Sequence, residues 1–122
     1  MIPESRAWSI LIVEDDPMLA YTLEEVLIED GFVIAGVIGT LQAALATAES
    51  CVCDAAIVDT NLKGESSGSV ALALAARGIP YIVLSGYSLN QRSTAFAGAH
   101  HLQKPCQPDR LIQALRTILS NQ

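Results

Sequence analysis

The chain has 122 residues, of which 51% are hydrophobic, so it is long enough for one domain with a hydrophobic core and too apolar to be disordered. Seven Lys and Arg residues against 13 Asp and Glu residues give a net charge of −6, and the basic residues form no cluster. This charge argues against direct binding to nucleic acid or to an anionic membrane, and it favours contact with cations or basic partner surfaces.

The N-terminal sequence MIPESRAWS lacks the pattern of a secretory signal, and no apolar run approaches the roughly 18 residues that cross a membrane. We therefore expect a cytoplasmic protein. The cysteines are odd in number and lack the spacing of a zinc site. We expect them to be small buried hydrophobic residues in a reducing compartment; they are Cys51, Cys53 and Cys106.

The first predicted strand is Ser9–Val13, and three carboxylates follow it directly, at Glu14, Asp15 and Asp16. Two carboxylates about 4 Å apart repel by roughly 4 kcal/mol at an effective dielectric constant near 20, so a cation, a helix N-terminus or solvent must offset such a cluster. Asp16 before Pro17 is typical of a helix N-cap, which accounts for one of the three carboxylates. Glu14 and Asp15 need another explanation.

The next elements alternate between helix and strand. A helix is predicted at Pro17–Asp30, because its apolar residues recur on one face and Gly31 is a suitable residue to follow its end. That apolar face consists of Leu19, Leu23, Val26 and Leu27. A strand at Phe32–Ile38 and a helix at Leu41–Glu49 come next. A third strand, Ala55–Val58, leads into Asp59 and a loop that contains Asn61 and Lys63.

The second half of the chain continues the alternation. It predicts a helix at Ser69–Arg77, a strand at Tyr81–Leu84, a short and loosely packed helix in the polar segment that begins at Ser88, a strand at His100–Gln103 and a last helix after Pro108. Ser85, Gly86 and Tyr87 follow the fourth strand, and Lys104 with Pro105 follows the fifth.

Five strands that alternate with five helices predict an α/β fold, with a doubly wound, five-stranded parallel sheet in the order 2-1-3-4-5 and helices on both faces. We expect one domain, residues 1–122 with a core of about 8–120, and no output domain after the last helix. Ligands of such sheets bind outside the carboxyl ends of the strands.

The residues at those strand ends are chemically complementary. Glu14, Asp15 and Asp59 would form an oxygen-rich pocket that suits a hard divalent cation, Mg²⁺ or Mn²⁺. Asp59, at the end of the central strand, can act as a carboxylate nucleophile that forms an aspartyl phosphate. Lys104 and Ser85 can then bind oxygens of the phosphoryl group.

These residues resemble those of a two-component response regulator receiver domain with the CheY-like fold, and the resemblance covers essentially the whole chain. Each motif is weak alone, but all of them in this order are specific. The motifs are the acidic pair Glu14-Asp15 in IVEDDP, Asp59 in AIVDTNLKG, Ser85-Gly86, and Lys104-Pro105.

The resemblance implies a role for each site residue. Asp59 is the phosphoacceptor, and Lys104 and Ser85 assist the transfer. Asp15 and Asp59 bind the metal directly, Asn61 adds its backbone carbonyl, and Glu14 acts through water. The peptide before Pro105 is expected to be cis. The phosphoryl donor is expected to be a sensor histidine kinase or a histidine phosphotransfer protein, and the chain is expected to catalyse at most its own phosphorylation and dephosphorylation.

The switch residues depart from the usual pattern. Typical receivers carry Tyr or Phe three positions before the lysine, whereas this chain has His101. The segment PYIVLSGYS is similar to a receiver subgroup with a Thr/Ser-Gly-Tyr loop, so Tyr87 is expected to take over part of the switch. The resemblance implies that the surface of the fourth helix, fifth strand and fifth helix changes on phosphorylation, and it allows a homodimer through that surface. Lys63 adds a cation where receivers often have Pro.

Two other functions stay open at this point. One is a degenerate receiver that acts as an unphosphorylated interaction module. Evidence against it is that the chain retains the acidic pair, Asp59, Ser85 and Lys104. His101, in place of the usual Tyr or Phe, is the feature that favours it. The other is a Mg²⁺-dependent phosphohydrolase with an aspartyl nucleophile, but Asn61 stands where haloacid dehalogenase-type enzymes carry a second Asp. The downstream target, and whether the chain acts alone or within a longer protein, also stay open.

Overall fold

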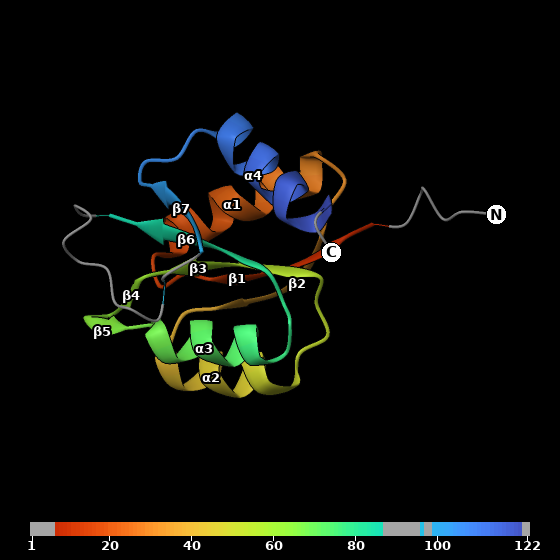
Figure 1. Cartoon of the computed structure of the whole chain (residues 1–122). Coiled ribbons are helices and arrows are strands. Elements are labelled where there is room, and N and C mark those ends of the chain that lie inside the picture. The colour runs from red at the N-terminus through yellow and green to blue at the C-terminus, as the bar shows by residue number, and fades with distance from the viewer. Residues whose placement is uncertain (1–6, 87–95, 97–98, 121–122) are drawn as a thin grey trace.

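The computed structural model describes residues 7–86, 96 and 99–120. Its main sheet has five parallel strands in the order β2-β1-β3-β6-β7, which is the predicted 2-1-3-4-5 order (Figure 1). The strands are β1 (Ser9–Val13), β2 (Val33–Ile38), β3 (Ala55–Asp59), β6 (Tyr81–Ser85) and β7 (His100–Gln103). The predicted strand boundaries therefore agree with the structure to within one residue.

Helices cover both faces of this sheet. Figure 1 shows α1 (Pro17–Glu29) and α4 (Pro108–Ser120) on one face, and α2 (Leu41–Ser50) and α3 (Gly68–Ala76) on the other. Asp16 caps α1 as predicted, since its Oδ1 accepts a hydrogen bond from Met18 N at 3.0 Å. Thr40 Oγ1 caps α2 by accepting from Ala43 N at 3.3 Å. None of the helices in the described part of the chain is long and apolar enough to cross a membrane.

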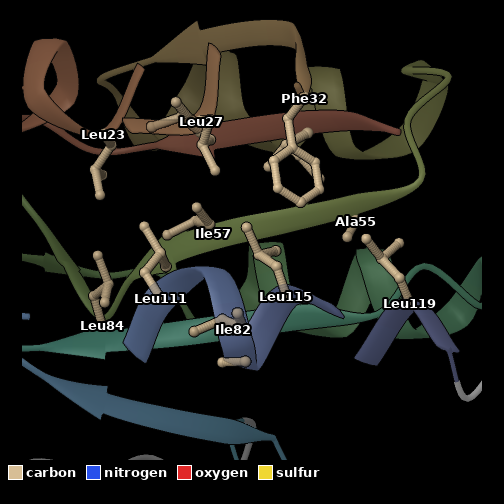
Figure 2. Packing of buried hydrophobic residues seen from close by; sticks show 13 residues of the cluster. Leu23, Leu27, Phe32, Ala55, Ile57, Ile82, Leu84, Leu111, Leu115 and Leu119 are labelled. Carbon is tan, nitrogen blue, oxygen red and sulfur yellow. The ribbon is translucent and has the colours of Figure 1, made fainter. Parts of the chain in front are cut away.

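Each face of the sheet has its own hydrophobic core. The apolar stripe predicted for the first helix is confirmed, because Leu23 and Leu27 are buried against α4 and the sheet. The last helix contributes Leu111, Leu115 and Leu119 to the same core, and Figure 2 shows them facing the α1 residues and the strand residues Ile57 and Ile82. Full burial of one such side chain stabilises the fold by about 1.5–3 kcal/mol. The sheet is therefore anchored on this face by the two helices nearest the chain ends.

The structure differs from the sequence prediction in three places. The loop after β3 contains a small antiparallel hairpin, β4 (Asn61–Leu62) with β5 (Glu65–Ser66), which the sequence did not predict. The cysteines are partly buried rather than fully buried, and all three are free thiols. The described residues contain four helices instead of five, because the segment of the predicted fourth helix lies mainly outside them.

Candidate functional site

The parallel register brings the predicted site residues to one edge of the sheet. Val13 pairs with Val58, Asp59 with Leu84, and Ser85 with Gln103, so the carboxyl ends of four strands lie at nearly the same level. The residues that follow or end these strands are Glu14, Asp59, Ser85 and Lys104. Because β3 is the central strand, Asp59 lies between the polar groups of its neighbours.

Three carboxylates form a compact acidic cluster at this edge. Glu14, Asp15 and Asp59 each offer a carboxylate oxygen, and these oxygens lie within 4.8 Å of one another. Glu14 is 3% exposed and Asp59 is 4% exposed, so solvent does little to reduce their mutual repulsion. Two carboxylates this deeply buried, with Asp15 beside them, are stabilised by a nearby cation.

Lys104 supplies one such cation. Its Nζ donates a hydrogen bond to Asp59 Oδ2 at 2.8 Å and lies 3.2 Å from Glu14 Oε1. Burial disfavours the charged ammonium, but the hydrogen bond to Asp59 and the two carboxylate charges outweigh it and hold the pKa of Lys104 above its usual value. The lysine therefore stays charged and bridges the two buried carboxylates.

Glu14 is buried among other charged groups. Burial raises the pKa of Glu14 to about 7, while the hydrogen bond that its Oε2 accepts from Asp16 N at 3.0 Å acts in the opposite direction. Asp59 raises this pKa further, and Lys104 lowers it. Glu14 Oε1 is buried and has no hydrogen bond of good geometry from the described residues, although it forms the ion pair with Lys104. This oxygen can therefore accept a further donor or a hydrated cation.

Asp15 is held from the loop after β3. Its Oδ2 accepts a hydrogen bond from Lys63 N at 2.8 Å. Burial acts to raise the pKa of Asp15, but this backbone hydrogen bond, together with the positive charge of Lys104 and other hydrogen bonds to the carboxylate, keeps the pKa below its usual value. Asp15 is thus a fixed, ionised carboxylate at neutral pH.

The hairpin explains how Lys63 reaches Asp15. Lys63 and Gly64 form its turn with φ values of 52° and 87°, a left-handed conformation that glycine adopts easily and lysine rarely does. Asn61 Oδ1 accepts a hydrogen bond from Gly64 N at 2.8 Å, and Asn61 N donates to Asp59 Oδ1 at 3.2 Å. Asn61 therefore links the hairpin to the carboxylate of Asp59.

Ser67 is a site neighbour that the sequence prediction missed. It is 0% exposed, and its hydroxyl donates a hydrogen bond to the main-chain carbonyl of Asp59. The sequence gives no signal for this role, because Ser66-Ser67 before a helix looks like an ordinary N-terminal capping segment.

Ser85 and the start of the next connection complete the edge. Ser85 is 6% exposed, and its main-chain oxygen accepts a hydrogen bond from Lys104 N at 2.9 Å. The peptide between Lys104 and Pro105 is cis, as the family resemblance implied.

Of the two switch candidates, the structure describes only His101. Tyr87 lies outside the described residues. His101 is partly buried on β7, and its Nε2 lies 3.1 Å from the carbonyl oxygen of Phe96. Its Nδ1 is buried without a hydrogen-bond partner among the described residues. His101 therefore contacts the main chain of Phe96 through a ring nitrogen. Tyr or Phe at the same position has no ring nitrogen and could not form this contact.

The donor set fits a hard divalent cation. All three side chains of the cluster offer carboxylate oxygens, the ligand type that Mg²⁺ and Mn²⁺ prefer, and one of these oxygens lacks a well-formed hydrogen bond. Sulfur and imidazole ligands, which favour softer metals, are absent from the cluster that the described residues form.

Comparison with known proteins decides the family. Residues 10–116 match the response regulator receiver domain family. This chain is a receiver domain. It belongs to two-component signalling, where receiver domains interact with histidine kinases. The sequence also shares 30% identity over 115 residues with the transcriptional regulatory protein PdtaR of Mycobacterium tuberculosis. That match covers 91% of this receiver domain and 56% of the relative, so the chain spans about half the length of the curated relatives it matches.

Solved structures agree with this assignment. The receiver domain is 41% identical to SdrG from Sphingomonas melonis Fr1, with a TM-score of 0.80 and coverage of 93% of this chain and 97% of that one. It is 27% identical to the signal receiver domain of a modulated diguanylate cyclase from Desulfovibrio desulfuricans G20, with a TM-score of 0.82 and coverage of 95% and 96%. Both similarities extend over nearly the whole chain.

Proposed function

We propose that this receiver domain accepts a phosphoryl group on Asp59 from a sensor histidine kinase or a histidine phosphotransfer protein, with Mg²⁺ or Mn²⁺ as the cofactor. The observation that carries the proposal is the convergence on Asp59, a buried carboxylate that contacts Lys104 at 2.8 Å and lies within the acidic cluster of Glu14 and Asp15. A structural ion pair needs one carboxylate and one cation, whereas this edge gathers three carboxylates around one lysine.

The metal would be held by the acidic cluster and the adjacent loop. Asp15 and Asp59 would bind it directly, Glu14 would act through a water molecule, and Asn61 would contribute its backbone carbonyl. The hydrogen bonds of Asp15 with Lys63 and of Asp59 with Asn61 already restrain these carboxylates. The metal, when bound, neutralises charge on the phosphoryl oxygens.

In the transfer itself, a carboxylate oxygen of Asp59 attacks the phosphorus atom of a phosphohistidine. The new bond joins this oxygen to phosphorus as the phosphorus–nitrogen bond breaks, and the imidazole leaves with the electron pair and takes up a proton. Lys104 moves from the carboxylate of Asp59 to a phosphoryl oxygen, and the Ser85 hydroxyl donates to another. The protein is therefore a phosphoryl acceptor that assists its own modification, rather than an enzyme that turns over a separate substrate.

Phosphorylation would be read at the surface next to β6 and β7. Capture of Lys104 and Ser85 by the phosphoryl group changes the ends of these two strands, and His101 on β7 contacts Phe96 directly. We propose that His101 and Tyr87 share the switch role and that a downstream protein, or a second copy of the chain, binds the changed surface formed by the segment before β7, β7 and α4.

The test is intact-mass analysis after incubation with Mg²⁺ and acetyl phosphate. The wild-type chain should gain a single phosphoryl group, and this gain should disappear in Asp59→Asn and in wild type treated with EDTA. Asp54→Asn is a matched control, because it removes a carboxylate at the opposite end of β3 and should leave the phosphoryl gain intact. Absence of any gain from both acetyl phosphate and a phosphorylated histidine kinase would favour an unphosphorylated interaction module.

A further inference from the structure

The main-chain carbonyl of Asp59 lies just beyond the last paired residues of β1 and β3. The pairing of β1 with β3 ends at Val13 and Val58, so Asp59 extends one residue beyond β1. On the other side, Thr60 N donates to Leu84 O of β6 at 3.0 Å. The carbonyl and N–H of one trans peptide point in opposite directions. The Asp59 carbonyl therefore points away from β6, toward the side where β1 has already ended.

Ser67 provides the missing partner. Its hydroxyl donates to Asp59 O, and its N donates to Thr60 O at 3.0 Å. Ser67 occupies the N-cap position of α3, yet it makes no capping hydrogen bond with its side chain. Ser66 performs that task instead, since its Oγ accepts from Gly68 N at 3.1 Å. The hydroxyl proton of Ser67 is thus committed to the phosphoacceptor's own backbone.

These contacts fix the Asp59–Thr60 peptide at both ends. Leu84 holds its N–H, and Ser67 holds its carbonyl. The carboxylate of Asp59 lies on one side of this peptide and Asn61 lies on the other, and the two are joined by the 3.2 Å hydrogen bond from Asn61 N to Asp59 Oδ1. A rotation of the peptide would therefore change the position of the carboxylate relative to the Asn61 backbone.

We propose that Ser67 is a positioning residue for phosphoryl acceptance: its hydroxyl holds the Asp59–Thr60 peptide so that the Asp59 carboxylate and the Asn61 carbonyl keep the spacing that a divalent cation requires. This inference rests on the proposed function. Ser67 touches neither metal nor phosphoryl group, and it acts through the backbone of Asp59.

The test compares Ser67→Ala with Ser66→Ala, a matched control that removes the neighbouring hydroxyl and only a capping contact. The first readout is amide hydrogen exchange in the metal-free protein, followed by NMR. Ser67→Ala leaves a buried carbonyl without a donor, so we expect Thr60 to exchange about 10-fold faster or more while Ile57, in the same strand, keeps its wild-type rate. A general loss of stability would accelerate both amides together.

The second readout is the Mg²⁺ dependence of phosphorylation by acetyl phosphate. We expect Ser67→Ala to require about 10-fold more Mg²⁺ for half-maximal rate and Ser66→Ala to match wild type. Ser67→Gly, which also lacks the hydroxyl, should repeat the result if the alanine variant does not fold. Wild-type Thr60 exchange and wild-type Mg²⁺ dependence in Ser67→Ala would overturn the inference. If wild type itself took up no phosphoryl group, the proposed function would fail, and Thr60 exchange would still test the role of Ser67.

Discussion

Lys104 neutralises part of the acidic cluster in the metal-free protein. Its ammonium lies 2.8 Å from Asp59 Oδ2 and 3.2 Å from Glu14 Oε1, and both carboxylates are nearly inaccessible to solvent. Removing one partner from a buried ion pair costs about 3–5 kcal/mol, because the remaining charge has no compensation. The lysine side chain is 24% exposed, so water offsets part of that cost here.

We therefore predict that Lys104→Met lowers the free energy of unfolding by about 2–3 kcal/mol in EDTA, near or below the lower limit for a buried pair. Chemical denaturation measures this change. The matched control is Lys63→Met, which removes an exposed ammonium and should change stability by less than about 0.5 kcal/mol. Equal effects of the two substitutions would show that Lys104 does not neutralise the cluster.

A second residue-scale prediction concerns Cys53. Burial and the neighbouring Cys51 thiol raise the pKa of Cys53 to about 12, so at about pH 8 only about one thiol in 10,000 is the reactive thiolate. We expect iodoacetamide to alkylate Cys53 at least about 100-fold more slowly in the folded chain than in guanidinium at the same pH. Peptide mass spectrometry gives both rates, and similar rates would contradict the assigned environment.

At the scale of elements, one contact ties the last helix to the end of the first. Arg116 of α4 donates to Asp30 Oδ2, and its guanidinium lies 5.2 Å from the centre of the Phe32 ring. Both charged groups are largely exposed, so the ion pair alone contributes little. The ring contact adds a comparable cation–π term.

We predict that Arg116→Ala lowers the free energy of unfolding by about 1 kcal/mol, the sum of a weak surface ion pair and one cation–π contact made by an exposed guanidinium. Arg110→Ala is the matched control on the same helix and should change stability by less than about 0.5 kcal/mol. Urea denaturation measures both variants. Because alanine favours helix at least as well as arginine, helix propensity cannot explain a loss. A loss in Arg110→Ala as large as that in Arg116→Ala would mean that removal of any arginine from α4, rather than this contact, sets the cost.

The elements that sequence predicted correctly are those with a repeated pattern. The apolar face of α1, the stripe of α4 and the apolar runs of β1, β2, β3 and β6 are regular enough to identify each element. The strand β7, with the sequence HHLQ, lacks such a run. The hairpin of β4 and β5 has two residues per strand, which is too short to show any period. Its turn depends on Lys63 in a left-handed conformation, which residue type alone does not predict.

At the scale of the whole molecule, topology made the site predictable. Glu14, Asp59, Ser85 and Lys104 are far apart in sequence, and only the strand order and the shared direction of the strands place them at one edge. The supporting contacts were not predictable, because they depend on how loops close over the sheet. Ser67 with the Asp59 carbonyl and Lys63 N with Asp15 are both contacts of this kind.

The whole molecule should also respond to the proposed metal. A cation that binds only the folded state stabilises it by about 2.7 kcal/mol at 100 times its dissociation constant. We predict that MgCl₂ raises the melting temperature relative to EDTA, because the metal relieves repulsion within the acidic cluster. Asp15→Asn should lose most of this rise, whereas Asp109→Asn, an exposed carboxylate on α4, should retain it. Thermal unfolding followed by circular dichroism measures the shift, and an equal rise in all three proteins would indicate a general salt effect.

The central claim is that Asp59 is the residue that receives the phosphoryl group. Borohydride reduces an aspartyl phosphate to homoserine, so reduction after phosphorylation marks the acceptor permanently. We predict that tandem mass spectrometry of wild type treated with Mg²⁺, acetyl phosphate and then borohydride finds homoserine at position 59 alone, and none when EDTA is present. Homoserine at another aspartate, or none at position 59 after uptake of a phosphoryl group, would contradict the account.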